Sequence, residues 1–194
     1  MTFDIILPTL RRDSLKQAVQ SVINQTHQDW NLYVVADGDA YDLQDELVSM
    51  DDRVFVIGGD FSNNDFGAEK RNRAIIEESE SYYIAYIDDD DVWLANHLEI
   101  LSTLLDNECD MARTAGRSFK MKHKSPRSKE KVPKLGPVNK VDILTVGMAH
   151  SRDLFEQTQG WLPCDNHDHI LWAEMLAAGG QPEVSEEITF LFRR

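Results

Sequence analysis

Residues Tyr82–Asp91 read YYIAYIDDDD, an apolar run that passes directly into four consecutive aspartates. The apolar part, Tyr82–Ile87, predicts a buried strand. Adjacent carboxylates repel one another and raise each other's pKa, and a hard divalent cation relieves this by taking oxygen ligands. Mg²⁺ typically binds one or two carboxylates and completes its shell with phosphate and water oxygens. The stretch therefore predicts a strand that ends at a metal-assisted anion site, and a solvated acidic turn is the alternative.

Three further apolar runs precede this strand, and each is followed by turn-forming or polar residues. Segments with helical spacing of apolar residues separate them, such as Leu15–Ile23 and Leu43–Met50. The runs are Phe3–Leu7 before Pro8-Thr9, Leu32–Ala36 before Asp37-Gly38-Asp39, and Val54–Ile57 before Gly58-Gly59. Alternating strands and helices predict βαβ units on a parallel sheet.

The fold class expected from this order is α/β, with a Rossmann-like, mostly parallel sheet flanked by helices. Ligands of open α/β sheets bind beyond the carboxyl ends of the strands. Because each polar cluster lies at such an end, we expect the clusters to line one crevice, with Asp37 and Asp90 on the same wall.

The second half of the chain is less regular and predicts mixed strands added to this sheet. Expected strands lie at 111–115, 146–150 and 188–192, and an expected helix covers 167–178. Residues 117–140 are basic, contain three prolines and show no apolar period, so they predict an irregular, mobile loop. We expect one domain over 1–194, with a nucleotide-binding half at 1–107 and an acceptor half at 108–194.

Charge and composition exclude several classes of protein. The 194 residues carry 34 acids against 20 bases, a net charge of −14, which argues against nucleic acid as the principal partner. Residues 113–140 contain ten bases and one acid, so this segment is +9 and the rest of the chain is −23. The sequence contains no candidate transmembrane segment or signal peptide, and its two cysteines have no metal-binding spacing. A cytoplasmic protein is the expectation.

The helix expected at 67–78 has its bases at the start and its acids at the end, which opposes the helix dipole. An anion bound near Lys70 and Arg71 would explain this order, and a solvated helix face is the alternative. Trp93 and Trp172 lie at helical positions and are expected in the core, as is His150. Trp161 follows Gly160 in a loop and could stack on a sugar ring.

These segments together resemble the family 2 glycosyltransferases of the GT-A type. Val34–Asp39 (VVADGD) resembles the family's VVDDGS turn, and Ile87–Trp93 (IDDDDVW) resembles its LDxDDxW segment with the DxD metal motif. Gly67 with Arg71-Asn72 resembles the G…ARN helix. Gly160-Trp161 with Asp168 resembles the GGF…ED region. The matches run from Asp4 to about Trp172 in the family's order.

The resemblance implies transfer of a sugar, with inversion, from a nucleotide sugar to a hydroxyl acceptor such as a saccharide. A UDP-sugar is the favoured donor, and Mn²⁺ or Mg²⁺ is the implied cofactor. Asp168 would be the general base and Asp90 the metal ligand. The residues that would bind the nucleotide and donor are Pro8, Thr9, Asp37, Arg71, Asp88 and Asp89, and Trp161 would contact the acceptor.

Two departures from the family pattern keep an alternative open. The sequence stops at Phe192-Arg193-Arg194, where members often continue into a loop that covers the donor. The basic segment at 117–140 could replace that loop by closing over the diphosphate. The alternative is a non-enzymatic module that binds a nucleotide or sugar without transfer.

Overall fold

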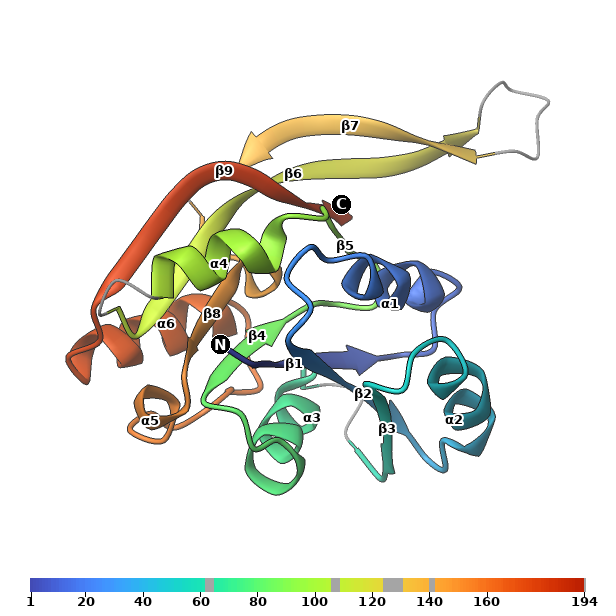
Figure 1. Cartoon of the computed structure of the whole chain (residues 1–194), viewed down its shortest axis with the longest axis horizontal. Coiled ribbons are helices and arrows are strands. Elements are labelled where there is room, and N and C mark those ends of the chain that lie inside the picture. Colours follow the sequence, from blue (N-terminus) through green and yellow to red (C-terminus); the bar gives the residue numbers. More distant parts are fainter. Residues whose placement is uncertain (62–64, 106–108, 124–130, 140–141, 194) are drawn as a thin grey trace.

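The computed structural model describes residues 1–61, 65–105, 109–123, 131–139 and 142–193. Within these ranges nine strands form one sheet in the order β3-β2-β1-β4-β8-β6-β9-β5, with β7 paired to β6 (Figure 1). The strands are β1 (Phe3–Thr9), β2 (Trp30–Asp37), β3 (Val54–Gly59), β4 (Tyr83–Tyr86), β5 (Val92–Trp93), β6 (Met111–His123), β7 (Lys131–Asn139), β8 (Met148–Ser151) and β9 (Pro182–Arg193).

The first four strands form the parallel sheet that the sequence predicts. β1 pairs in parallel with β2 and with β4, and β2 pairs in parallel with β3. β8 is antiparallel to both β4 and β6, while β6 and β9 are parallel. The expected mixed sheet is confirmed.

Helices cover both faces of this sheet. Successive strand residues point to opposite sides, so an apolar strand presents apolar side chains to both faces. Ile5 and Val34 face one apolar cluster, whereas Ile6 and Val35 face the other. The first cluster contains residues of α1 (Leu15–Ile23), α2 (Tyr41–Val48) and α4 (His97–Leu105). The second contains residues of α3 (Ala68–Arg73), a following π-helical turn (Ala74–Glu78), α5 (Arg152–Phe155) and α6 (His167–Ala177).

The expected irregular loop at 117–140 is wrong for the residues that the structure describes. β6 continues to His123 and pairs antiparallel with β7, in register from Gly116↔Asn139 to His123↔Lys131. β6 also pairs with β9 as far as Phe119↔Arg193. Pairing between distant segments therefore makes strands where the local sequence has no apolar run.

The other expectations for the core are confirmed. Trp93 and Trp172 are buried. His150 is fully buried, with Nε2 2.6 Å from the Tyr86 hydroxyl and Nδ1 2.9 Å from the Ser151 carbonyl. Among the described residues, no helix is both long and apolar enough to cross a bilayer.

Candidate functional site

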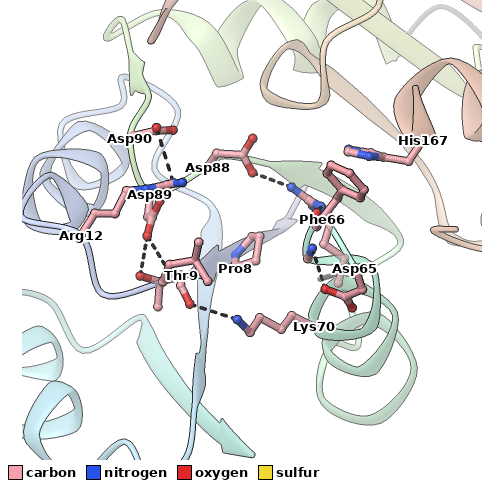
Figure 2. A pocket seen from close by; sticks show the side chains of 13 residues that line it. Pro8, Thr9, Arg12, Asp65, Phe66, Lys70, Asp88, Asp89, Asp90 and His167 are labelled. Atoms are coloured by element: carbon pink, nitrogen blue, oxygen red, sulfur yellow. Dashed lines mark hydrogen bonds and ion pairs between the residues drawn. The ribbon is translucent and has the colours of Figure 1, made fainter. Parts of the chain in front are cut away.

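A cavity of about 470 Å³ opens at the carboxyl ends of β1 and β4 (Figure 2). Its walls come from the β1–α1 loop, the start of α3, the acidic strip Asp88–Asp90 after β4, and His167 at the start of α6. Its size lies in the range of about 300–1,000 Å³ that is usual for small-molecule sites. β3 ends at a separate cavity, which Gly58 and Gly59 line, so the expected crevice joins fewer strand ends than predicted.

Asp89 holds the β1–α1 loop against β4. Its buried carboxylate accepts hydrogen bonds from the Thr9 hydroxyl at 2.8 Å and the Leu10 amide at 2.8 Å. Arg12 donates to its other oxygen at 2.5 Å. The Thr9 hydroxyl also accepts from the Arg11 amide at 2.8 Å. Two of the predicted donor-binding residues, Thr9 and Asp89, thus hydrogen-bond to each other and to this loop.

In the strip Asp88–Asp90, Asp90 has a looser contact than Asp88 or Asp89. Its nearest cation is the Arg12 guanidinium, with Nη1 3.4 Å away. Burial raises the pKa of Asp90, Arg12 opposes this shift, and the neighbouring charges of Asp88 and Asp89 add to it. A cation at this carboxylate would relieve the unfavourable charge.

Lys70 and Asp37 form an ion pair beside the cavity. Lys70 is 2% exposed, and its Nζ donates to Asp37 Oδ2 at 2.9 Å and to the Thr9 carbonyl at 3.2 Å. Asp37 Oδ1 is buried and accepts no hydrogen bond from the described residues. The side chain of Asp37 does not line the cavity, whereas Lys70 does. Lys70 is thus buried and paired with Asp37, which excludes the alternative of a solvated helix face for this residue.

Arg71 makes the matching pair on the other side. It is 2% exposed, donates to Asp88 at 2.5 Å and to the Phe66 carbonyl at 2.7 Å, and its Nε is buried without a partner among the described residues. Its guanidinium also lies over the ring of Trp161, 4.8 Å from the centroid. The bases at the start of α3 are therefore explained by the acids that face them.

Asp65-Phe66-Gly67 is a part of the site that sequence reasoning missed. Asp65 accepts from the Gly67 amide at 2.9 Å and from the Glu69 amide at 2.7 Å, and so closes the turn into α3. Gly67 has φ of +77°, and Pro8 and Arg71 leave little room for a Cβ there. Phe66 also has a positive φ, +57°, and is 53% exposed at the cavity. An Asp-x-Gly turn before a helix was the available signal.

Trp161 does not offer a face to an acceptor in this structure, which corrects the expectation. It is 1% exposed and packs edge-on against Tyr86 and His167. Asn72 fixes its backbone by donating to the Trp161 carbonyl at 2.9 Å and accepting from the Trp161 amide at 2.8 Å. The exposed ring at the cavity is instead that of Phe66, which lies 5.9 Å from the His167 ring.

Asp168, the predicted base, lies in the first turn of α6 and is not a lining residue of the cavity. Its side chain is 15% exposed and accepts from the amide and the ring Nδ1 of His169 at 2.9 and 3.0 Å. Its neighbour His167 does line the cavity. Burial lowers the pKa of His167, and the Arg71 charge lowers it further.

The described residues contain no cluster of three or more His, Cys, Asp or Glu side chains arranged to hold a metal. The available donors are carboxylate oxygens of Asp90 and Asp88, the hard ligands that Mg²⁺ and Mn²⁺ prefer. One or two such carboxylates suffice where a diphosphate supplies further oxygens. The donor chemistry therefore fits a divalent cation that binds together with a phosphate ligand.

A parallel sheet with a cavity at its carboxyl ends, lined by an acidic strip and buried bases, defines an open α/β protein of the kind that binds its ligand at this edge. Residues 4–162 match the model of glycosyl transferase family 2, and the chain therefore belongs to that family. This confirms the resemblance inferred from the motifs.

Two curated relatives are similar over about half of the chain. A putative teichuronic acid biosynthesis glycosyltransferase, TuaG of Bacillus subtilis, is 29% identical over 115 residues, 57% of this chain and 44% of the relative. The Escherichia coli enzyme WfgD, a UDP-Glc:alpha-D-GlcNAc-diphosphoundecaprenol beta-1,3-glucosyltransferase, is 29% identical over 106 residues, 53% of this chain and 41% of the relative. The chain spans less than half the length of these two relatives.

Solved structures share the fold. S. aureus TarS superposes with a TM-score of 0.75 at 15% identity, covering 100% of this chain and 37% of that chain. TarS 1–349 in complex with UDP-GlcNAc gives a TM-score of 0.72 at 15% identity, with coverages of 100% and 59%. The GT-A-type fold expected from the sequence is confirmed.

Proposed function

We propose that this chain is a metal-dependent, inverting glycosyltransferase that moves a sugar from a nucleoside diphosphate sugar to a hydroxyl acceptor. The observation that carries the proposal is one cavity at the carboxyl ends of β1 and β4 that is lined both by Asp90 and by two buried bases, Lys70 and Arg71. Carboxylates and fixed cations together suit a ligand that carries a diphosphate and its metal.

Asp37 and its surroundings are assigned to the nucleoside. Asp37 Oδ1 is a buried acceptor without a donor among the described residues, so a base N–H would satisfy it. Lys70 donates to the other oxygen and so orients the carboxylate. UDP is the favoured nucleotide, because a complex of TarS with UDP-GlcNAc has the same fold and the WfgD donor is named as UDP-Glc.

Arg71, Arg12 and the strip Asp88–Asp90 are assigned to the diphosphate and its cation. Asp90, with Asp88 beside it, would hold Mn²⁺ or Mg²⁺, and the cation would stabilise the negative charge on the leaving diphosphate. The bases act as fixed positive groups around the same oxygens. Arg12 contacts Asp90, the proposed ligand of the cation, and its side chain is 44% exposed. It can therefore turn toward the phosphate as the cation binds.

Asp168 is assigned as the general base. The acceptor oxygen forms a bond to the anomeric carbon, the bond from that carbon to the diphosphate oxygen breaks, and the hydroxyl proton passes to the Asp168 carboxylate. Attack opposite the leaving group inverts the anomeric centre. His169 donates to Asp168 and so orients the carboxylate. The acceptor is proposed to be a saccharide or another hydroxyl compound.

The test is nucleotide release from a panel of sugar nucleotides with Mn²⁺ or Mg²⁺, compared with Asp90→Asn. We expect turnover that EDTA abolishes and that Asp90→Asn lowers by about 10²-fold or more. Asp45→Asn is the matched control, because Asp45 is an exposed aspartate on α2. Turnover by Asp90→Asn equal to that of the control would reject the assignment.

The second candidate is a module that binds a nucleotide sugar without transferring the sugar. The structural observation that favours it is the placement of Asp168 outside the cavity lining. Calorimetry with UDP and Mn²⁺ separates the two functions: saturable binding with no turnover on any donor and acceptor pair supports the module.

A further inference from the structure

Two rings form the side of the cavity that faces α6, namely Phe66 before α3 and His167 at the start of α6 (Figure 2). Their centroids lie 5.9 Å apart. The described residues at 117–123 and 131–139 do not line this cavity, which corrects the expectation that this segment closes over the diphosphate. Neither ring takes part in the nucleoside and diphosphate contacts proposed above, so this side of the cavity is free for another part of the ligand.

The imidazole of His167 presents a nitrogen that can only accept a hydrogen bond. Nδ1 lies 3.1 Å from the Cys164 carbonyl oxygen, and because a carbonyl only accepts, the proton of this hydrogen bond is on Nδ1. Burial and the Arg71 charge lower the pKa of His167, so the ring is neutral near pH 7. Nε2 is then an acceptor, and none of the described residues donates to it.

Phe66 holds an aromatic side chain at the same cavity in a fixed backbone conformation. It is 53% exposed, and its φ of +57° is strained for a residue with a side chain. Asp65 closes the turn by accepting from the Gly67 and Glu69 amides. Arg71 Nη1 donates to the Phe66 carbonyl at 2.7 Å. These contacts fix the turn, so an apolar wall stands at the cavity before any ligand binds.

A sugar ring matches an apolar wall that lies beside a lone hydrogen-bond acceptor. A pyranose has a face of C–H groups that packs on an aromatic ring, and hydroxyl groups at its edge that donate hydrogen bonds. A phosphate carries no proton to spare at neutral pH, so its oxygens and the Nε2 lone pair of His167 would repel each other. The pair therefore suits the sugar of a sugar nucleotide and not its diphosphate.

The neighbours of the pair indicate which sugar it contacts. Arg71, assigned to the diphosphate, donates to the Phe66 carbonyl and lies over the Trp161 ring. That ring packs edge-on against His167, and Asp168, the proposed base, is the next residue on α6. The transferred sugar must lie between the diphosphate and the base, because its anomeric carbon breaks one bond and forms the other.

We propose that Phe66 and His167 bind the sugar of the donor, with the Phe66 ring packed against it and His167 Nε2 accepting from one of its hydroxyl groups. This assignment rests on the proposed transferase function and adds the residues that select the sugar. A site built to accept from a hydroxyl discriminates against a donor that lacks the hydroxyl, because the buried acceptor is then left unpaired.

The experiment compares the Kd of UDP with the Kd of the tightest-binding member of a UDP-hexose panel, by calorimetry with Mn²⁺ and without acceptor. We expect Phe66→Leu and His167→Phe each to weaken binding of the UDP-hexose about fivefold and to leave the Kd of UDP within about twofold. His167→Gln keeps an accepting oxygen and should lose less than His167→Phe. Matching thermal unfolding checks that the variants fold.

A second measurement identifies the hydroxyl group that His167 contacts. UDP-hexoses with one hydroxyl replaced by fluorine keep the shape of the sugar but cannot donate a hydrogen bond. In the wild type one such replacement should weaken binding about fivefold, and in His167→Phe the same replacement should cost nothing, because the acceptor is already absent. A cost that is the same in both proteins at every position would overturn the role of His167.

Phe55→Leu and His27→Phe are the matched controls. Phe55 is 44% exposed on β3, His27 packs against Phe3 at the opposite end of β1, and neither lines the cavity. Equal losses in control and site variants, or an equal loss of UDP and UDP-hexose binding, would overturn the proposal. A raised KM for the acceptor alone would also overturn it. No binding of UDP by the wild type would reject the proposed function itself, so the two failures are distinguishable.

Discussion

The two halves of the sheet are built in different ways. In the first half, β1, β2 and β4 each contain an apolar run that is buried between clusters on both faces of the sheet. In the second half, β6 and β9 extend well beyond their apolar residues, and long-range pairing defines them. A strand that is buried on both faces is mostly apolar and is therefore visible in the sequence. A strand that depends on its neighbour is not.

The two halves meet at two buried histidines. His97 on α4 lies 2.7 Å from the Thr189 hydroxyl of β9, and that hydroxyl donates to Thr114 of β6 at 2.7 Å. His150 of β8 lies 2.6 Å from the Tyr86 hydroxyl of β4. The groups proposed to bind the diphosphate belong to the first half and the proposed base to the second, so these contacts bear on the alignment of the whole site.

The largest expected effect tests whether the second half contributes to the chemistry. Asp168→Asn should lower kcat by about 10²–10⁴-fold with little change in the Kd for UDP, because it removes a proton acceptor and leaves the donor site intact. Asp165→Asn, an exposed position in the preceding loop, is the control. Rates measured with donor and acceptor at saturation check this. A wild-type kcat in Asp168→Asn would confine the chemistry to the first half.

The next effect concerns His97 and His150, the two buried histidines at which the halves meet. Burial lowers the pKa of His97 to about 3 and that of His150 to about 4, so both stay neutral in the folded protein. The unfolded chain binds a proton at each near pH 6.5, so stability is present above this pH and is lost as the pH falls. Between about pH 6.5 and 5 each should remove on the order of 2 kcal/mol of unfolding free energy.

Urea unfolding across this pH range measures the loss. The substitution His150→Gln should reduce the slope of the unfolding free energy against pH, because it removes one of the two fully buried histidines. Proton uptake by the folded state at Asp90 and Asp91, whose pKa values burial raises, acts in the opposite direction. If His150→Gln leaves the pH dependence of the unfolding free energy unaltered, His150 does not contribute to the loss of stability at low pH.

A smaller effect tests the ion pairs of the first half. Lys70→Met leaves Asp37 without its cation and should lower the free energy of unfolding by about 2–3 kcal/mol and weaken UDP binding. The double variant Lys70→Met/Asp37→Asn should recover part of the stability but not the binding. Lys16→Met removes an exposed partner of Glu46 and should cost less than about 0.5 kcal/mol. Equal losses at Lys70 and Lys16 would contradict a buried pair.

The smallest effect belongs to the β6–β7 strand pair. Lys120→Gln relieves repulsion from Lys134 across the strand pair and should raise the free energy of unfolding by about 0.2–0.5 kcal/mol at low salt. The gain should disappear at high salt, because exposed charges are screened. Denaturant unfolding at two salt concentrations measures it. A clear loss of stability would show that Lys120 has a structural partner.

Much of the fold and part of the site could be predicted from the sequence alone. The apolar runs identified β1 to β4, and Asp37 and Asp88–Asp91 were located because each follows such a run. The position of a polar residue directly after a buried strand places it at the carboxyl edge of a parallel sheet. The motifs in their order then identified the family, which the match over residues 4–162 bears out.

Only the tertiary structure showed which polar groups are paired and which ring is exposed. The sequence is equally consistent with Lys70 and Arg71 on a solvated helix face. The structure pairs them with Asp37 and Asp88, which are distant in sequence. Trp161, expected to contact an acceptor, is buried, and the ring exposed at the cavity is that of Phe66, because burial depends on neighbours from other elements. Residues 117–123 are extended because β9 and β7 supply partners for their backbone, and the side chains of a short segment do not encode a distant partner.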